Sequence, residues 1–129
     1  FTIIAAGRVS SAEDAAKLTA LGADIASIGT AALIAMGCIM IHKCHLGFCP
    51  AVITNKIAEN PKKILSLETA TRWVVNLIEG WSAELKLILE RLGLKSIEEL
   101  KGRRDLLVGL GLSDSSLEVL GIRGVSSNS

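Results

Sequence analysis

Three cysteines lie close together in the sequence and could bind a metal. Cys38, Cys44 and Cys49 fall in the segment GCIMIHKCHLGFCP with the spacing C-x5-C-x4-C. Both gaps are longer than the gap of the close cysteine pairs that open most structural zinc sites and the ferredoxin motif. Three soft thiolates on one short segment nevertheless suit an iron–sulfur cluster. Spacing alone leaves two alternatives open: a zinc site completed by His42 or His45, or three small side chains packed in a core.

The cysteine count also bears on the cellular compartment. The chain has three cysteines, and an odd number cannot pair completely in disulfides within one chain. Disulfides are rare where thiols are kept reduced. We therefore expect the protein in the cytoplasm.

The segment that precedes the cysteines predicts a strand–helix–strand–helix unit. Apolar runs at Thr2–Ala5 and Ile25–Ile28 predict two strands, and Ala12–Leu21 predicts a helix that ends at Gly22. A second helix is expected from Ala31. Strands without polar alternation are typical of parallel strands buried on both faces. The pattern predicts an α/β fold, either a sheet or a barrel.

Two strands cannot complete such a sheet, because they leave edges and one face open. The sequence also starts at Phe1 with no signal-peptide pattern. Its 129 residues allow one ordinary domain or part of a larger one. We expect the missing strands to lie upstream, in a longer protein of which this chain is a C-terminal piece.

The rest of the chain predicts a mostly α-helical extension. Apolar residues three or four apart predict a long amphipathic helix over about Ser66–Leu92. We divide the chain into residues 1–60, with the strands and cysteines, residues 61–124, which form the helical extension, and residues 125–129, a disordered tail.

Two shorter helices are expected within the extension. Ser96 with Glu99, and Ser115 with Glu118, have the spacing of capping boxes, in which a serine and an acidic side chain bond reciprocally to the first backbone amides. The second of these helices is expected to end at Gly121.

Composition argues against two classes of partner. The formal net charge is +1 and only 3% of the residues are aromatic, so the chain lacks both the charge and the stacking platforms of a nucleic-acid-binding protein. The run Ile25–Ile41 carries no charge, but it is shorter than a membrane span and contains Gly29 and Gly37. A buried strand followed by a buried helix explains this run better than a membrane span does.

Longer stretches of the sequence resemble a known family. The segment GADIASIGTAALIAMGCIMIHKCHLGFCP is similar to the flavin domain of glutamate synthase large subunits, in which GTAAL follows the last barrel strand. The similarity starts near Ile4 in IAAGRVSSAEDAAKLTALGAD and continues to SIEELKGRRDLL. The resemblance implies that Cys38, Cys44 and Cys49 hold a 3Fe-4S cluster.

The same resemblance implies a (β/α)8 TIM barrel, with Thr2–Ala5 and Ile25–Ile28 as its last two strands. The loops after the last two strands of such barrels commonly bind a phosphate. Gly7 and Arg8 follow the first strand, and Gly29 and Thr30 follow the second. The resemblance therefore implies that these four residues bind the phosphate of FMN. Because they share no residue with the cysteine segment, we expect FMN binding to be independent of the cluster.

The activity that the resemblance implies is the reductive amination of 2-oxoglutarate to L-glutamate with ammonia released from glutamine. The cluster would relay electrons to FMN. The partners implied are the missing N-terminal part of the barrel and an electron donor, either ferredoxin or a subunit that oxidises NAD(P)H. No nucleic acid and no membrane are expected. The alternative from another class is a non-catalytic zinc or iron–sulfur binding module.

Overall fold

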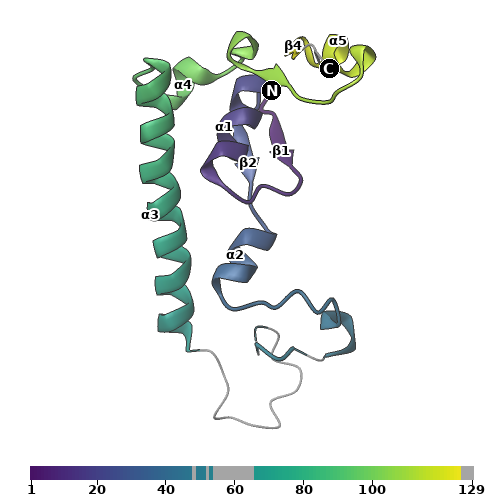
Figure 1. Cartoon of the computed structure of the whole chain (residues 1–129). Helices are drawn as coiled ribbons and strands as arrows, with labels where there is room; N and C mark the ends of the chain where they lie inside the picture. Colours follow the sequence, from purple (N-terminus) through teal and green to yellow (C-terminus); the bar gives the residue numbers. More distant parts are fainter. Residues whose placement is uncertain (48, 52, 54–65, 126–129) are drawn as a thin grey trace.

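The computed structural model of the chain describes residues 1–47, 49–51, 53 and 66–125. A small βαβ unit lies beside one long helix, and a C-terminal group of short elements lies across the end of both (Figure 1). The boundary expected between residues 60 and 61 and residues 126–129 of the expected tail lie outside the described residues.

The βαβ unit forms as the sequence predicts. Strand β1 (Ile4–Ala6) pairs in parallel with β2 (Ile25–Ser27), with Ile4 opposite Ile25. Helix α1 (Ala12–Leu21) connects the two strands and has the predicted bounds. Local signals set both of its ends: Ser11 Oγ accepts a hydrogen bond from the Asp14 N–H at 3.1 Å, and Gly22 adopts the left-handed conformation at φ 118°.

As expected of a sheet with only two strands, β1 and β2 leave apolar side chains exposed. Ile4 is 63% exposed and Ile25 is 49% exposed. The two strands form a sheet of their own, and the elements packed on them leave these side chains open. The pair is compatible with two neighbouring strands of a barrel, whose other strands would cover the exposed side chains.

The long helix α3 (Leu67–Leu92) carries the core of the chain. It begins after Ser66, whose Oγ accepts a hydrogen bond from the Thr69 N–H, and it ends at Gly93 in the left-handed conformation. Figure 1 shows α3 running alongside α1 and α2 (Thr30–Ala35), and it packs against both. The buried residues of the core cluster come from α1, α3 and the extension: Ala16, Ala20, Leu89 and Leu100. Alanines on the facing side of α1 allow the two helices to approach closely.

The C-terminal extension differs from the prediction in its short elements. It contains α4 (Ile97–Leu100), η3 (Arg104–Leu106), β3 (Val108–Gly109), α5 (Asp114–Leu120) and β4 (Arg123–Gly124). Strands β3 and β4 pair in parallel, so the extension holds a small sheet that the sequence analysis missed. Strands of two residues are too short to show a hydrophobic period.

Both expected capping boxes are corrected. Helix α5 begins two residues earlier than expected, because Ser113 caps it: Ser113 Oγ accepts the Ser116 N–H at 3.2 Å. At α4 the Ser96 side chain makes no capping bond, and the Lys95 N–H donates instead to Glu99 Oε2 at 2.9 Å. The acidic half of the box is therefore formed, but Glu99 bonds to the backbone N–H of Lys95 and not to that of Ser96.

The uncharged run Ile25–Ile41 is divided between β2, the six-residue helix α2 and the loop after it. Over the part of the chain that the structure describes, no helix has the length and apolar character needed to cross a bilayer. The run therefore does not form the continuous helix that a membrane span requires.

Candidate functional site

A cavity of about 660 Å³ lies where the loops after β1 and β2 meet the start of the cysteine segment. We call it the loop cavity. Its polar lining consists of Arg8, Ser10, Thr30 and His42. Its apolar lining residues are Val9, Ala31, Ile34, Ala35, Met40 and Leu77.

The parallel pairing of the strands brings the two loops together. Because β1 and β2 run in the same direction, the carboxyl ends of both strands lie at the same end of the sheet. Gly7 and Arg8 turn the chain out of β1, and Gly29 precedes α2, which begins at Thr30. Arg8 and Thr30 line the loop cavity, whereas Gly7 and Gly29 are not among its lining residues. Two of the four expected phosphate-binding residues thus face one space.

The backbone around the loop cavity is strained at three positions. Arg8, Met40 and His42 have φ angles of 52°, 55° and 57°, and they are the non-glycine residues with positive φ in the part of the chain described by the structure. This left-handed conformation is uncommon for residues with a Cβ atom. All three residues line the loop cavity. Backbone strain of this kind clusters at ligand-binding sites.

The charge around the loop cavity favours an anion. Arg8 contributes a guanidinium group, and no carboxylate is among the described residues that line the cavity. The nearest carboxylate to Ser10 is already engaged: the backbone N–H and the hydroxyl of Ser10 donate to Asp14 Oδ2 at 2.9 and 2.8 Å. These bonds hold the pKa of Asp14 below its usual value. Arg8, Thr30 and His42 remain as possible donors to a ligand.

The three cysteines follow α2 directly. The Cys38 N–H donates to Leu33 O at 2.9 Å, which ties Cys38 to the end of α2. Cys44 begins the short 3₁₀ helix η1 (Cys44–Leu46) and is exposed, and Cys49 lies further along the same segment and is half-buried. Over residues 1–47, 49–51, 53 and 66–125, no three His, Cys, Asp or Glu side chains form a group that could hold a metal ion.

The chemistry of the cysteines nevertheless fits an iron–sulfur cluster. The Met40 N–H donates to Cys38 Sγ at 3.4 Å, and the Ile53 N–H donates to Cys49 Sγ at 3.3 Å. Hydrogen bonds to sulfur stabilise a thiolate and tune the potential of a cluster. The donor set fits such a cluster, although these side chains are not already gathered around one point.

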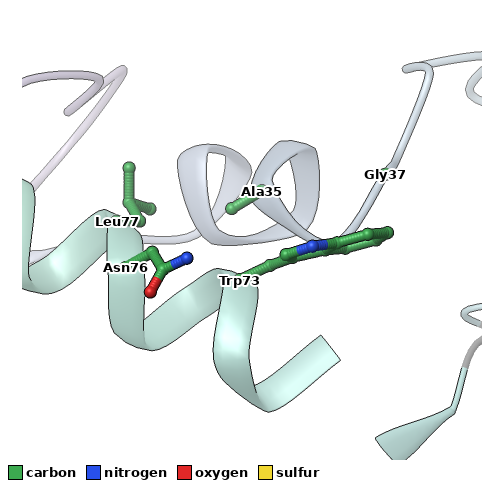
Figure 2. Close-up of a pocket in the computed structure, with 5 residues that line it drawn as sticks. All are labelled: Ala35, Gly37, Trp73, Asn76 and Leu77. Atoms are coloured by element: carbon green, nitrogen blue, oxygen red, sulfur yellow. The ribbon is translucent and has the colours of Figure 1, made fainter. Parts of the chain in front are cut away.

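A second, more open cavity of about 530 Å³ lies between α2 and α3. Figure 2 shows the Trp73 ring extending from α3 to Gly37, with Asn76 and Leu77 on the same helix and Ala35 opposite. Ala35 and Leu77 line both cavities, so α3 closes the loop cavity from one side. The sequence analysis missed Met40, His42 and Leu77 as cavity residues. No sequence pattern could place them in the same cavity as Arg8 and Thr30, since this depends on the path of the whole chain.

Comparison with known proteins gives consistent matches. Residues 1–95 match the family model described as a conserved region in glutamate synthase. The chain is 44% identical over 122 residues to the archaeal glutamate synthase (NADPH) of Methanocaldococcus jannaschii, a match covering 95% of this chain and 24% of that protein. It is 39% identical over 101 residues to the glutamate synthase (NADH) of Schizosaccharomyces pombe, covering 78% of this chain and 5% of that protein. The chain thus spans about a quarter of the length of the archaeal relative.

Proposed function

Because the chain belongs to the glutamate synthase family, we propose that it is the C-terminal part of the FMN-binding barrel of a glutamate synthase. The proposed reaction is the reductive amination of 2-oxoglutarate to L-glutamate with ammonia from glutamine. The single observation in the structure that supports this most is the loop cavity. Two βα loops of a parallel sheet meet there, as at the phosphate sites of TIM barrels.

Arg8 and Thr30 would bind the phosphate of FMN in the loop cavity. The Arg8 guanidinium would pair with the phosphate charge and the Thr30 hydroxyl would donate a hydrogen bond. Gly7 and Gly29 would set the backbone path of the two loops without lining the cavity. Gly7 adopts φ 126°, a conformation that residues with a side chain rarely adopt. When bound, FMN would supply the hydride chemistry, while the protein holds and orients it.

Cys38, Cys44 and Cys49 would hold the 3Fe-4S cluster. The hydrogen bonds that the Met40 and Ile53 N–H groups donate to Cys38 Sγ and Cys49 Sγ support this role, because hydrogen bonds to the sulfurs are among the features that tune protein-bound clusters. When bound, the cluster would supply single-electron transfer. Cys44, which is exposed at the start of η1, would be the third ligand.

The electron source is proposed from the relatives. The proteins from Methanocaldococcus jannaschii and Azospirillum brasilense both carry NADPH in their names. This favours a subunit or domain that oxidises a nicotinamide nucleotide over ferredoxin as the donor. Thiolate ligands also favour a reducing compartment such as the cytoplasm.

The test is a composition and activity measurement on the intact protein, purified without oxygen. We expect FMN, iron and acid-labile sulfide, together with glutamate formation from glutamine, 2-oxoglutarate and NADPH. Protein that contains zinc alone, or that binds no flavin, would contradict the proposal and favour a non-catalytic metal-binding module.

A matched pair of variants tests the phosphate site. Thr30→Val removes the cavity hydroxyl and keeps the side-chain shape, so FMN affinity should fall by about fivefold to tenfold, as expected for one lost hydrogen bond. Thr19→Val is the control, because Thr19 Oγ1 donates to Ala15 O inside α1 at 3.0 Å, away from the loop cavity. Equal FMN affinity in the two variants would show that the Thr30 hydroxyl does not bind the phosphate.

A further inference from the structure

The cysteine segment forms one wall of the loop cavity. Met40 and His42 lie between Cys38 and Cys44 in the sequence, and both line the same space as Arg8 and Thr30. The expectation that FMN binding is independent of the cluster took account of the sequence alone, and the structure adds that part of the cysteine segment lines the same cavity as the two βα loops. The loops share no residue in the sequence, but they share a cavity.

His42 has the features of a ligand-binding residue. Its side chain is exposed and lines the cavity, so a ligand can reach the ring. Its backbone is held at φ 57°, and the neighbouring strained residues Arg8 and Met40 line the same cavity. A conformation that costs free energy persists only where its surroundings hold it, and such positions are concentrated at binding sites.

The available donors point to the chemistry of the ligand. Arg8 supplies the charge and Thr30 a hydroxyl, while the Ser10 hydroxyl is already donated to Asp14 at 2.8 Å. An imidazole ring carries an N–H donor in both its neutral and its protonated forms. A phosphate group has three oxygens that accept such bonds, so it can accept a hydrogen bond from His42 in addition to those from Arg8 and Thr30.

We propose that His42 donates a hydrogen bond to the phosphate of FMN in the loop cavity and so selects FMN over riboflavin, which lacks the phosphate. This inference rests on the proposed function. It places one residue of the phosphate site on the segment that carries the cluster ligands. Phosphate binding then restrains the chain between Cys38 and Cys44, where the Met40 N–H also donates to Cys38 Sγ at 3.4 Å.

The experiment compares FMN and riboflavin binding to the intact protein after removal of its flavin, by quenching of flavin fluorescence. His42→Gly removes the ring and tolerates the left-handed backbone. We expect about tenfold weaker FMN binding, as for the loss of one hydrogen bond to a charged group, and unchanged riboflavin binding. His45→Gly is the matched control, because His45 is exposed on the same segment but does not line the loop cavity. It should change neither affinity.

The outcomes separate this inference from the proposed function. An equal loss of affinity for both flavins would mean that His42 only shapes the segment, and no loss would mean that it does not touch the phosphate; either overturns the inference. A wild-type protein that binds neither flavin would overturn the proposed function itself. His42→Asn is the second variant, since its amide also donates and asparagine also tolerates a left-handed backbone. We expect its preference for FMN to exceed that of His42→Gly, and equal preferences would count against the inference.

Discussion

At the residue scale, the three cysteines differ in how the fold holds them. The Cys38 N–H is hydrogen-bonded to the end of α2, and the Cys38 sulfur accepts a hydrogen bond from the Met40 N–H. Cys44 is exposed at the start of η1. A ligand on an exposed short helix can be replaced without disturbing the packed core, which makes Cys44 the best position at which to test metal binding.

Cys44→Ser should remove or severely deplete the iron–sulfur cluster in the intact protein, because a serine hydroxyl is mostly protonated and is a poor substitute for a thiolate. FMN should remain bound, since Cys44 is not among the residues lining the loop cavity. Iron content, flavin absorbance and NADPH-driven glutamate formation are the measurements. The neighbouring exposed variant His45→Ser should keep its iron. Normal iron and activity in Cys44→Ser would show that Cys44 is not a ligand.

At the element scale, Leu117 of α5 packs against both strands of the small sheet. Gly109 and Gly124 are opposite each other in β3 and β4. A Cβ atom at Gly109 would lie 2.4 Å from Leu117 Cδ2, and one at Gly124 would lie 2.5 Å from Leu117 Cδ1. The two methyl groups of Leu117 are thus each seated on a glycine. Because Leu117 lies this close to both strands, a Cβ atom at either glycine would force its side chain to shift.

Gly109→Ala should therefore destabilise the C-terminal extension by about 1–3 kcal/mol, the usual cost of overpacking. Gly80→Ala is the matched control: Gly80 lies inside α3, and among the described residues nothing beyond the adjoining helix backbone is within 4 Å of the added Cβ atom. Alanine is favoured over glycine in a helix interior by about 1 kcal/mol, so this variant should be more stable than wild type. Chemical denaturation of the intact protein measures both. Equal stability of Gly109→Ala and Gly80→Ala would contradict the expected overpacking of Leu117.

At the scale of the whole molecule, polar contacts join the extension to the βαβ unit. The Gly102 N–H donates to Thr19 O at 3.0 Å, and the Arg104 guanidinium donates to Leu21 O at 3.3 Å. These bonds satisfy carbonyl groups at the C-terminal end of α1, where positive charge is also favourable. Lys101 forms an ion pair with Asp24, which also accepts the Ile3 N–H at 2.9 Å. Hydrogen bonds and an ion pair between residues far apart in the sequence thus attach the extension to the βαβ unit.

Asp24→Asn should weaken this attachment in a pH-dependent way. The Ile3 N–H, followed by Lys101, lowers the pKa of the Asp24 carboxyl below its usual value. A lowered pKa means that the charged carboxylate stabilises the fold above its ordinary pKa and loses this effect as the pH falls through the folded-state value. Wild type should be more stable than Asp24→Asn at pH 7, and the difference should shrink below about pH 3.8.

Glu13→Gln is the control for this comparison, because Glu13 pairs only locally with Lys17 along α1. Its effect on denaturation should be small at every pH. A difference between wild type and Asp24→Asn that is the same at pH 7 and pH 3 would assign the effect to something other than the charge of Asp24.

The exposed strands carry a second prediction at this scale. Ile4 and Ile25 present apolar side chains from a two-stranded sheet whose edges are open. Apolar surface and open strand edges promote association. We expect the 129-residue chain, expressed alone, to self-associate and to form no glutamate. Size-exclusion chromatography with light scattering checks this, and a monomer over a wide range of concentration would contradict it.

The sequence by itself determined the two longest helices, α1 and α3. Ser11 and Gly22 mark the ends of α1, and Ser66 and Gly93 mark those of α3, because caps and apolar periods act over a few neighbouring residues. The cysteine spacing and the family resemblance are likewise features of the order of residues along the chain.

Only the tertiary structure decided which residues share a cavity. Arg8, His42 and Leu77 come from a loop, the cysteine segment and α3, and they meet because parallel pairing, strained turns and the packing of α3 bring them together. The packing of Leu117 on two glycines could not be predicted from the sequence either. Contacts between distant residues depend on the path of the whole chain, which local patterns do not record.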